Sequence, residues 1–235
     1  MVNQGRGSQR LFPPWWDHQR HSLIGLRRSL ERMLAGPAIP REGDRIVDFG
    51  CGDRPYEPLL TRFGATYVAC DLEGDVDVKI VPGEPIPLDD ASADGVVSFQ
   101  VLEHVWDLDW YLGECHRILK PGGWLLLSTH GTWLYHPHPT DFRRWTRDGL
   151  IGELRDRKLD VEAVDGIVGP LAWTTQFRLL GLHHLLGRIP FFGRLILFPI
   201  ACLMNLRMVL EDAITPASIR QTNACVYLTF SRKRT

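Results

Sequence analysis

The stretch RIVDFGCGDRPY, residues 45–56, decides the fold. Its first half, residues 45–49, is mostly apolar and predicts a buried strand, and its second half is a turn that contains glycine. A strand that leads into such a turn is typical of α/β proteins that bind nucleotide-type cofactors. Gly50 and Gly52 fit the opening of a dinucleotide fingerprint, but its third glycine position holds Pro55. The sequence therefore predicts a cofactor site and raises the question of which cofactor it holds.

Outside this stretch, strands alternate with helices. The expected strands are residues 65–71, 76–81, 93–100, 124–129, 159–166 and 224–230. The expected helices are residues 22–36, a short one through Leu59 and Leu60, 108–119 and 146–157. Ser22 is expected to cap the first helix, which carries Leu26 and Leu30 on an apolar face. Alternating strands and helices predict an α/β fold with a largely parallel sheet covered on both faces.

Composition excludes several classes of function. A net charge of -1 gives no basic face for nucleic acid, and we expect no nucleic-acid partner. The five cysteines have no CxxC spacing, which is typical of reduced thiols, and residues 1–16 lack a signal-peptide core. The apolar segment 189–210 is interrupted by Arg194, Pro199 and Arg207, so it is not predicted to span a membrane. We expect a cytoplasmic protein, with membrane association as an open alternative.

Two carboxylates indicate the kind of cofactor. Asp48 and Asp53 flank the glycine turn, where they would repel a pyrophosphate by a few kcal/mol at an effective dielectric constant of about 20. They suit a cofactor that has an ammonium group and no phosphate, such as S-adenosylmethionine (SAM). Asp71, at the end of the next expected strand, can accept hydrogen bonds from ribose hydroxyls. NAD is the weaker alternative.

Four motifs together resemble a known family. VDFGCGDRPY (47–56), VACDLEG (68–74), IPLDDASADGVVSFQVLEHV (86–105) and RILKPGGWLLLSTHG (117–131) resemble, in order and spacing, class I SAM-dependent methyltransferases of the type 11 (UbiE-like) group. The resemblance covers roughly residues 40–165. It implies a Rossmann-like fold whose seven-stranded sheet is mostly parallel with an antiparallel last strand. An apolar helical insert would precede that strand.

The resemblance also implies roles for individual residues. The methionine end of SAM would lie at Asp48, Gly50 and Gly52, and the ribose at Asp71 beside Leu72. Many relatives have an aspartate for the adenine amino group where this chain has Pro82, so backbone groups and apolar packing would hold adenine. The remaining cofactor candidates are Gly83 and Glu84 near adenine, Gln100 and Val101 near the sulfonium, and Tyr56, which either covers the cofactor or packs on a helix.

Candidate acceptor residues follow the fourth and fifth expected strands. We expect His136 or His138 to act as a base or to orient the acceptor, with His104 as a further candidate that also suits a structural role. Tyr135, Asp141, Arg144 and Trp145 are the candidate acceptor contacts, and Arg144 would bind an anionic acceptor or pair with Asp141. Some relatives bind a metal through Glu-x-x-Glu-His, but this chain has Gln100 in place of the first glutamate, so no metal is predicted.

These features predict four segments. Residues 1–38 would form a basic segment with a capping helix, 39–169 the SAM-binding core, 170–221 the apolar insert, and 222–235 the last strand. The insert would serve as a lid, a dimer surface or a peripheral membrane contact. The expected function is methylation of a small molecule, on oxygen, such as a sugar, a lipid-linked intermediate or a natural product. A SAM-dependent cyclase and a catalytically silent assembly partner are the alternatives.

Overall fold

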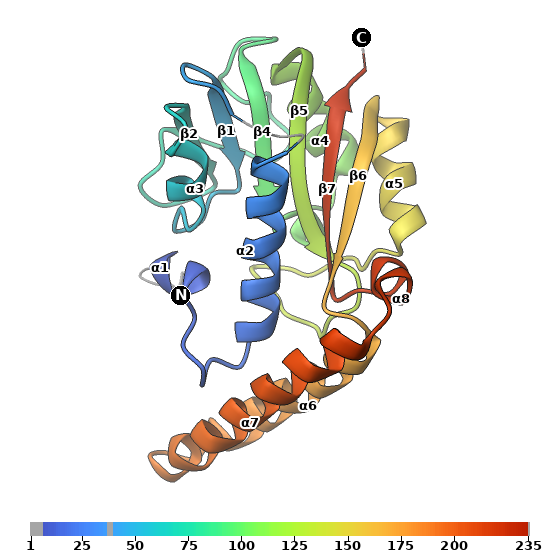
Figure 1. Ribbon diagram of the computed structural model, residues 1–235. Coiled ribbons are helices and arrows are strands. Elements are labelled where there is room, and N and C mark those ends of the chain that lie inside the picture. Colours follow the sequence, from blue (N-terminus) through green and yellow to red (C-terminus); the bar gives the residue numbers. More distant parts are fainter. Residues whose placement is uncertain (1–6, 37–39, 235) are drawn as a thin grey trace.

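The computed structural model describes residues 7–36 and 40–234, and within them it has a seven-stranded sheet at its centre (Figure 1). The strands are β1 Arg45–Phe49, β2 Thr66–Asp71, β3 Val78–Lys79, β4 Ala93–Phe99, β5 Leu119–His130, β6 Leu159–Ile167 and β7 Val226–Lys233. Their order across the sheet is β3-β2-β1-β4-β5-β7-β6. The expected seven-stranded α/β fold is confirmed.

Five neighbouring strands run in one direction. Val47 of β1 lies opposite Val68 of β2 and Val96 of β4, in parallel register. The last strand, β7, is antiparallel to both β5 and β6, as the resemblance implied. The carboxyl ends of β1, β2, β4 and β5 therefore meet at one edge of the sheet, which is where ligands bind in open α/β sheets.

Helices cover both faces of the sheet because the apolar residues of its strands alternate between them. Ile46 belongs to the hydrophobic cluster beneath α2, and Val47 to the cluster beneath α4 and α5. The helices are α1 Gly7–Leu11, α2 Arg20–Leu34, α3 Glu57–Thr61, the 3-10 helix η1 Leu102–His104, α4 Leu108–Ile118, α5 Arg147–Asp156, α6 Pro170–Leu186, α7 Phe192–Ile214 and α8 Ala217–Thr222.

Two local predictions differ from the structure. Ser22 does not cap α2, because the helix begins at Arg20 and Ser22 is buried inside its first turn, where its hydroxyl donates to Gln176 of α6. Contact with α6 thus extends the helix past the cap that the sequence suggested. The expected third strand is shortened to Val78–Lys79, and β5 begins at Leu119, before the Pro121-Gly122-Gly123 turn signal.

The insert forms a long antiparallel helical hairpin of α6 and α7 between β6 and β7 (Figure 1). Figure 1 shows the hairpin crossing beneath the carboxyl edge of the parallel strands and projecting beyond the sheet. Its base is fixed by polar contacts: Asn205 donates to the carbonyl oxygens of Trp15 and Asp17, and His21 Nε2 lies 2.6 Å from Asp212 Oδ2. The hairpin therefore stands next to the edge at which a site is expected. The four-segment division stays a prediction.

Candidate functional site

The turn after β1 is held against the end of β2. The Gly50 N–H donates to the Cys70 carbonyl oxygen at 2.8 Å, and the Gly52 N–H donates to Asp71 Oδ2 at 2.7 Å. Asp71 Oδ1 accepts from the Leu72 N–H at 2.6 Å. A carboxylate oxygen has two lone pairs, so Asp71 can brace the turn and still accept hydrogen bonds from a ribose.

Gly50 is required by its backbone and by its neighbour. Its φ of +91° is a conformation that residues with a side chain rarely adopt. A Cβ atom built there would lie 2.5 Å from Val101 Cγ2. Val101, just after β4, therefore packs directly over the turn after β1, and the two candidate cofactor residues are neighbours.

Asp48 lies beneath this turn with one oxygen unsatisfied. Its side chain is buried, the Tyr67 hydroxyl donates to Oδ2 at 2.6 Å, and Oδ1 has no hydrogen-bond partner. Burial, with a further contribution from the nearby charge of Asp71, raises the pKa of Asp48 to about 7. An orphaned, buried carboxylate oxygen fits the ammonium group of SAM, which would supply both a donor and a positive charge.

At the turn expected to lie beside adenine, hydrogen bonds hold the backbone turn that contains Gly83 and Glu84, whereas the Glu84 side chain is free of the core. Gly83 has a φ of +85° in a turn closed by the Glu84 N–H, which donates to the Val81 carbonyl oxygen. The Glu84 side chain is exposed, while its carbonyl oxygen accepts from Trp110 Nε1 at 2.7 Å. Trp110 also stands edge-on to Phe49 at the end of β1. Sequence reasoning missed Trp110, which ties the adenine turn to the cofactor edge.

The other cofactor candidates lie in different surroundings. Gln100 has a φ of +59°, and its side-chain amide donates to Ser128 Oγ of β5 at 3.1 Å. Leu72 is 39% exposed at the end of β2, so a ligand can reach it. Tyr56 is buried against Phe99, and burial raises the pKa of its hydroxyl to about 12. Of the two roles foreseen for Tyr56, packing is the one its position supports, and a cofactor contact stays a prediction.

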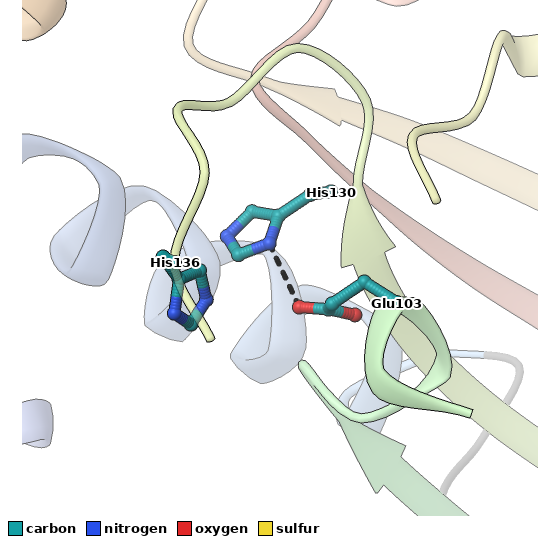
Figure 2. A group of neighbouring side chains, drawn as sticks. All are labelled: Glu103, His130 and His136. Atoms are coloured by element: carbon teal, nitrogen blue, oxygen red, sulfur yellow. Dashed lines mark ion pairs between the residues drawn. The ribbon is translucent and has the colours of Figure 1, made fainter. Parts of the chain in front are cut away.

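A buried acid–imidazole pair lies at the ends of β4 and β5. Figure 2 shows Glu103 of η1 and His130 of β5 facing one another, with His136 beside them. Glu103 Oε1 and His130 Nδ1 are 2.8 Å apart, outside hydrogen-bond geometry, and Thr129 donates to Glu103 Oε2 at 2.8 Å. Burial acts to raise the pKa of Glu103, but the electrostatic interaction with His130 and the hydrogen bond from Thr129 leave that pKa below its ordinary value.

Three further histidines gather around this pair. The His136 ring lies edge-on to His130 at 5.1 Å, to His104 at 4.9 Å and to His138 at 5.3 Å between ring centroids. Burial, with repulsion from His130 and His104, lowers the pKa of His136 to about 4, so this ring is neutral at neutral pH. His104 Nδ1 faces the Thr140 carbonyl oxygen. The structure thus brings His104 and His138 to His136, which in turn contacts His130.

The loop that carries His136 is braced by an ion pair. Arg144 contacts Asp141 Oδ1 at 2.5 Å and Oδ2 at 2.6 Å, and it donates to the carbonyl oxygens of Trp133 and Leu134. Its hydrogen bonds to Asp141 lower the pKa of that carboxyl to about 2. Asp141 Oδ2 also accepts from the His136 N–H at 2.8 Å. Pairing with Asp141, one of the two roles foreseen for Arg144, is confirmed, and contact with an anionic acceptor stays a prediction.

The two aromatic acceptor candidates differ in exposure. Tyr135 is 74% exposed and accessible to a ligand. Trp145 is buried in the hydrophobic cluster beneath α4 and α5, and its N–H backbone group donates to the His130 carbonyl oxygen. Trp145 therefore packs in the core, and an acceptor contact there stays a prediction. Trp133, which sequence reasoning missed, stacks on His130 with ring centroids 4.9 Å apart.

Glu103, His130 and His136 are also the described residues that could hold a metal ion, because one ligand atom from each lies within 4.8 Å of the others. A carboxylate and two imidazoles suit a transition metal. That this site functions without a metal ion therefore remains a prediction. The pairing of Glu103 with His130 was not predicted from the sequence, although the shared carboxyl edge of β4 and β5 was an available signal.

Proteins with similar sequences are methyltransferases. A methyltransferase domain model matches residues 16–158. A probable SAM-dependent methyltransferase of Mycolicibacterium smegmatis is 32% identical over 153 residues, which are 60% of this chain and 56% of that protein. A ubiquinone biosynthesis O-methyltransferase of Cereibacter sphaeroides is 28% identical over 61% of this chain and 71% of that protein. The chain thus spans little more than half the length of the mycobacterial relative.

A solved structure supports the fold. The cyclase SpnF superposes with a TM-score of 0.59 at 17% identity, over 92% of this chain and 84% of that one. At this identity the likeness concerns the fold alone. Since the methyltransferase domain model matches more than half of the chain, and its relatives are SAM-dependent enzymes, the resemblance drawn from the sequence is confirmed: the chain belongs to the methyltransferase domain family, within the class I SAM-dependent methyltransferases.

Proposed function

We propose that this protein transfers a methyl group from SAM to an oxygen atom of a small molecule. The observation that carries the proposal is the position of the segment 101–103, which lies between the expected cofactor turn at one end and the histidine cluster at the other. Val101 packs on the Gly50 turn, and Glu103, two residues later, faces His130. A methyl donor bound at the turn would thus lie beside a cluster of imidazoles, which is what methylation of a hydroxyl requires.

SAM would supply a methyl group activated on a sulfonium. Asp48 would hold its ammonium group, Asp71 its ribose, and Val101 would line the reacting end. The acceptor oxygen attacks the methyl carbon, the carbon–sulfur bond breaks with its electrons left on sulfur, and the acceptor proton passes to an imidazole. The products are the methylated acceptor and S-adenosylhomocysteine.

We propose His130 as that imidazole and His136, His138 and His104 as groups that orient the acceptor. Glu103 lies against Nδ1 of His130 and would stabilise the imidazolium formed when the ring takes the proton. His136, with a pKa of about 4, is neutral and can accept a hydrogen bond, but it is a weak base. His138, which the sequence also suggested as a base, is the alternative to His130.

The acceptor class proposed is a hydroxylated small molecule such as a sugar, a lipid-linked intermediate or a natural product. Support comes from the Cereibacter sphaeroides relative, which is named for O-methylation in ubiquinone biosynthesis. Further support comes from Trp133 and Phe177, aromatic rings 6.1 Å apart beside the histidine cluster. The reaction would take place in the cytoplasm, and the α6–α7 hairpin would serve as a surface for contact with another molecule or a membrane.

The test begins with calorimetric titration of S-adenosylhomocysteine into the wild type and the Asp71→Ala variant. Micromolar binding that weakens about 100-fold in the variant is expected, because two charge-assisted hydrogen bonds are lost. Incubation with SAM and a panel of hydroxylated acceptors, read by mass spectrometry, should then give products heavier by one methylene. Products of unchanged mass would favour a cyclase, and a folded wild type without binding would favour a silent assembly partner.

A further inference from the structure

The α6–α7 hairpin exposes more apolar surface than a water-soluble hairpin normally carries. Among the described residues, α7 is the helix long and apolar enough to cross a membrane by length and composition, with a mean hydropathy of 1.6 over its most apolar window, 28% of which is buried. Contiguous exposed apolar surface of this kind marks a contact with another protein or a membrane.

The exposure is greatest at the hairpin tip, residues 185–196. Leu185 is 66% exposed, Phe191 75%, Phe192 64% and Leu195 62%. Four large side chains therefore point into water at the end of the hairpin that Figure 1 shows farthest from the sheet. Removing apolar side chains of this size from water is favourable, so a surface that covers the tip would be stabilised.

Helix α7 is apolar on both sides along its length. Leu197, Ala201 and Met208 are buried on its inner side, whereas Leu203 and Leu210 are 68% and 61% exposed on its outer side. A helix at the surface of a soluble protein normally has a polar outer face. The outer face of α7 therefore continues the apolar surface of the tip towards the base of the hairpin.

Charge identifies what covers this surface. Residues 166–210 contain four arginines and no aspartate or glutamate; Arg207 pairs with Glu211 in the last part of α7, whereas Arg188 and Arg194 are exposed within the tip. A second copy placed symmetrically on this surface would bring arginines close to arginines and give them no acidic partner within the segment. Anionic lipid headgroups would neutralise the arginines while the acyl region takes up the apolar side chains.

The N-terminal segment adds interfacial aromatic residues to the same surface. Trp15 and Trp16 are 48% and 54% exposed, and the Trp16 ring lies 5.4 Å from that of Phe198 of α7. The Arg20 guanidinium lies 4.3 Å from the centre of the Trp15 ring. Tryptophan and arginine side by side are typical of segments at the headgroup level of a bilayer.

We propose that the tip and the outer face of α7 bind the surface of an anionic lipid bilayer, with the arginines and Trp15 and Trp16 at the headgroups. An interfacial position fits better than a span, because Arg194 and Arg207 interrupt α7 and Asn205 anchors it to residues 15–17.

The consequence for the substrate rests on the proposed function. Phe177 of α6 contacts Trp133, which stacks on His130, so the hairpin is joined to the histidine cluster by aromatic rings. A bilayer held by the hairpin would lie near the mouth of the acceptor site. The acceptor would then be an amphipathic molecule dissolved in the membrane with its hydroxyl group near the headgroups.

The test is flotation of the full chain with vesicles of phosphatidylcholine alone and of phosphatidylcholine with about 30% phosphatidylglycerol. The wild type should float with the anionic vesicles and weakly or not at all with the neutral ones. Phe191→Ser/Phe192→Ser/Leu195→Ser should weaken binding about 100-fold or more. Arg188→Gln/Arg194→Gln should weaken it about tenfold or more, with anionic vesicles only.

Ile219→Ser, an exposed apolar residue of α8, is the matched control and should float like the wild type. The proposal is overturned if the wild type fails to float with anionic vesicles, or if the tip variant floats unchanged. Sedimentation equilibrium that shows a dimer lost in the tip variant, without flotation, would assign the surface to a second copy. Binding of S-adenosylhomocysteine, measured without lipid, keeps a failure of this proposal distinct from a failure of the methyltransferase proposal.

Discussion

Glu103 Oε1 lies 2.8 Å from His130 Nδ1, and this pair joins the carboxyl ends of β4 and β5. Both side chains are almost completely buried, at 0% and 6% exposure, and Thr129 holds the second carboxylate oxygen. A buried carboxylate needs a partner to stay ionised. The pair therefore fixes the orientation of the His130 ring beside the residues proposed to bind the acceptor.

The first prediction concerns the proton on this ring. The negative charge of Glu103 lies against Nδ1 of His130, so electrostatic attraction should keep the ring proton on Nδ1 and leave Nε2 as the acceptor. In Glu103→Gln the amide can donate to Nδ1 and move the proton to Nε2, so turnover should fall about 10²- to 10⁴-fold. Nitrogen NMR of the imidazoles would report the tautomer without an acceptor. Unchanged tautomer and turnover, with S-adenosylhomocysteine binding intact, would remove His130 from the mechanism.

The second prediction concerns metal removal. Two ligands of one tetrahedral ion, at bonds of about 2.0–2.1 Å, lie about 3.3 Å apart. Glu103 Oε1 and His130 Nδ1 are closer than that, which favours direct contact between the two side chains over a shared ion. Dialysis against a chelator should therefore leave methyl transfer unchanged, as measured by product formation before and after. Activity lost on dialysis and restored by a divalent ion would refute the absence of a metal.

The third prediction concerns the pH dependence of cofactor binding. Asp48 has a pKa of about 7 in the free protein, and the ammonium group of S-adenosylhomocysteine should bind its ionised form. Affinity should therefore fall as the pH drops below about 7, by up to about tenfold per pH unit, and binding near neutral pH should release a proton. Calorimetry at several pH values and in two buffers measures both effects. Asp48→Asn should bind weakly with no such slope, and an equal slope in the variant would assign it to another group.

The fourth prediction concerns the contact between Gly50 and Val101. Gly50→Ala should lower the free energy of unfolding by about 1–3 kcal/mol, because it adds backbone strain and a clash with Val101. In a Val101→Ala background the clash should shrink while the strain stays, so the penalty should be smaller but not zero. Urea unfolding of the four proteins of this cycle measures the coupling. Equal penalties in both backgrounds would show that Val101 does not press on the turn.

The fifth prediction concerns the brace of the acceptor loop. Arg144→Ala removes the partner of Asp141 and the donors to Trp133 and Leu134, so amide exchange in residues 131–145 should accelerate. Binding of S-adenosylhomocysteine should be unchanged, because the turn after β1 does not depend on this loop. Arg147→Ala, which changes a half-buried arginine at the start of α5, is the control and should exchange like the wild type. Unchanged loop exchange in Arg144→Ala would contradict a bracing role.

Local patterns in the sequence determined the sheet and the cofactor edge. The apolar run of residues 45–49 and the glycines at Gly50 and Gly52 act through their nearest chain neighbours, so strand, turn and parallel topology could be predicted. Asp71 was expected at the cofactor edge because the end of β2 must lie beside that of β1. The structure adds that Asp71 also accepts a hydrogen bond from the Gly52 N–H.

Tertiary structure alone decided the features that depend on pairs far apart in the chain. The sequence placed Ser22 at a helix cap, but packing on Gln176 of α6 drew it inside the helix. Glu103 and His130 became partners only because β4 and β5 end side by side. The insert was expected to be apolar and helical, but which of its side chains remain exposed depends on how α7 packs on α6. Local propensity fixes the elements, whereas the pairing of buried charges and the uncovered apolar faces follow from packing between elements.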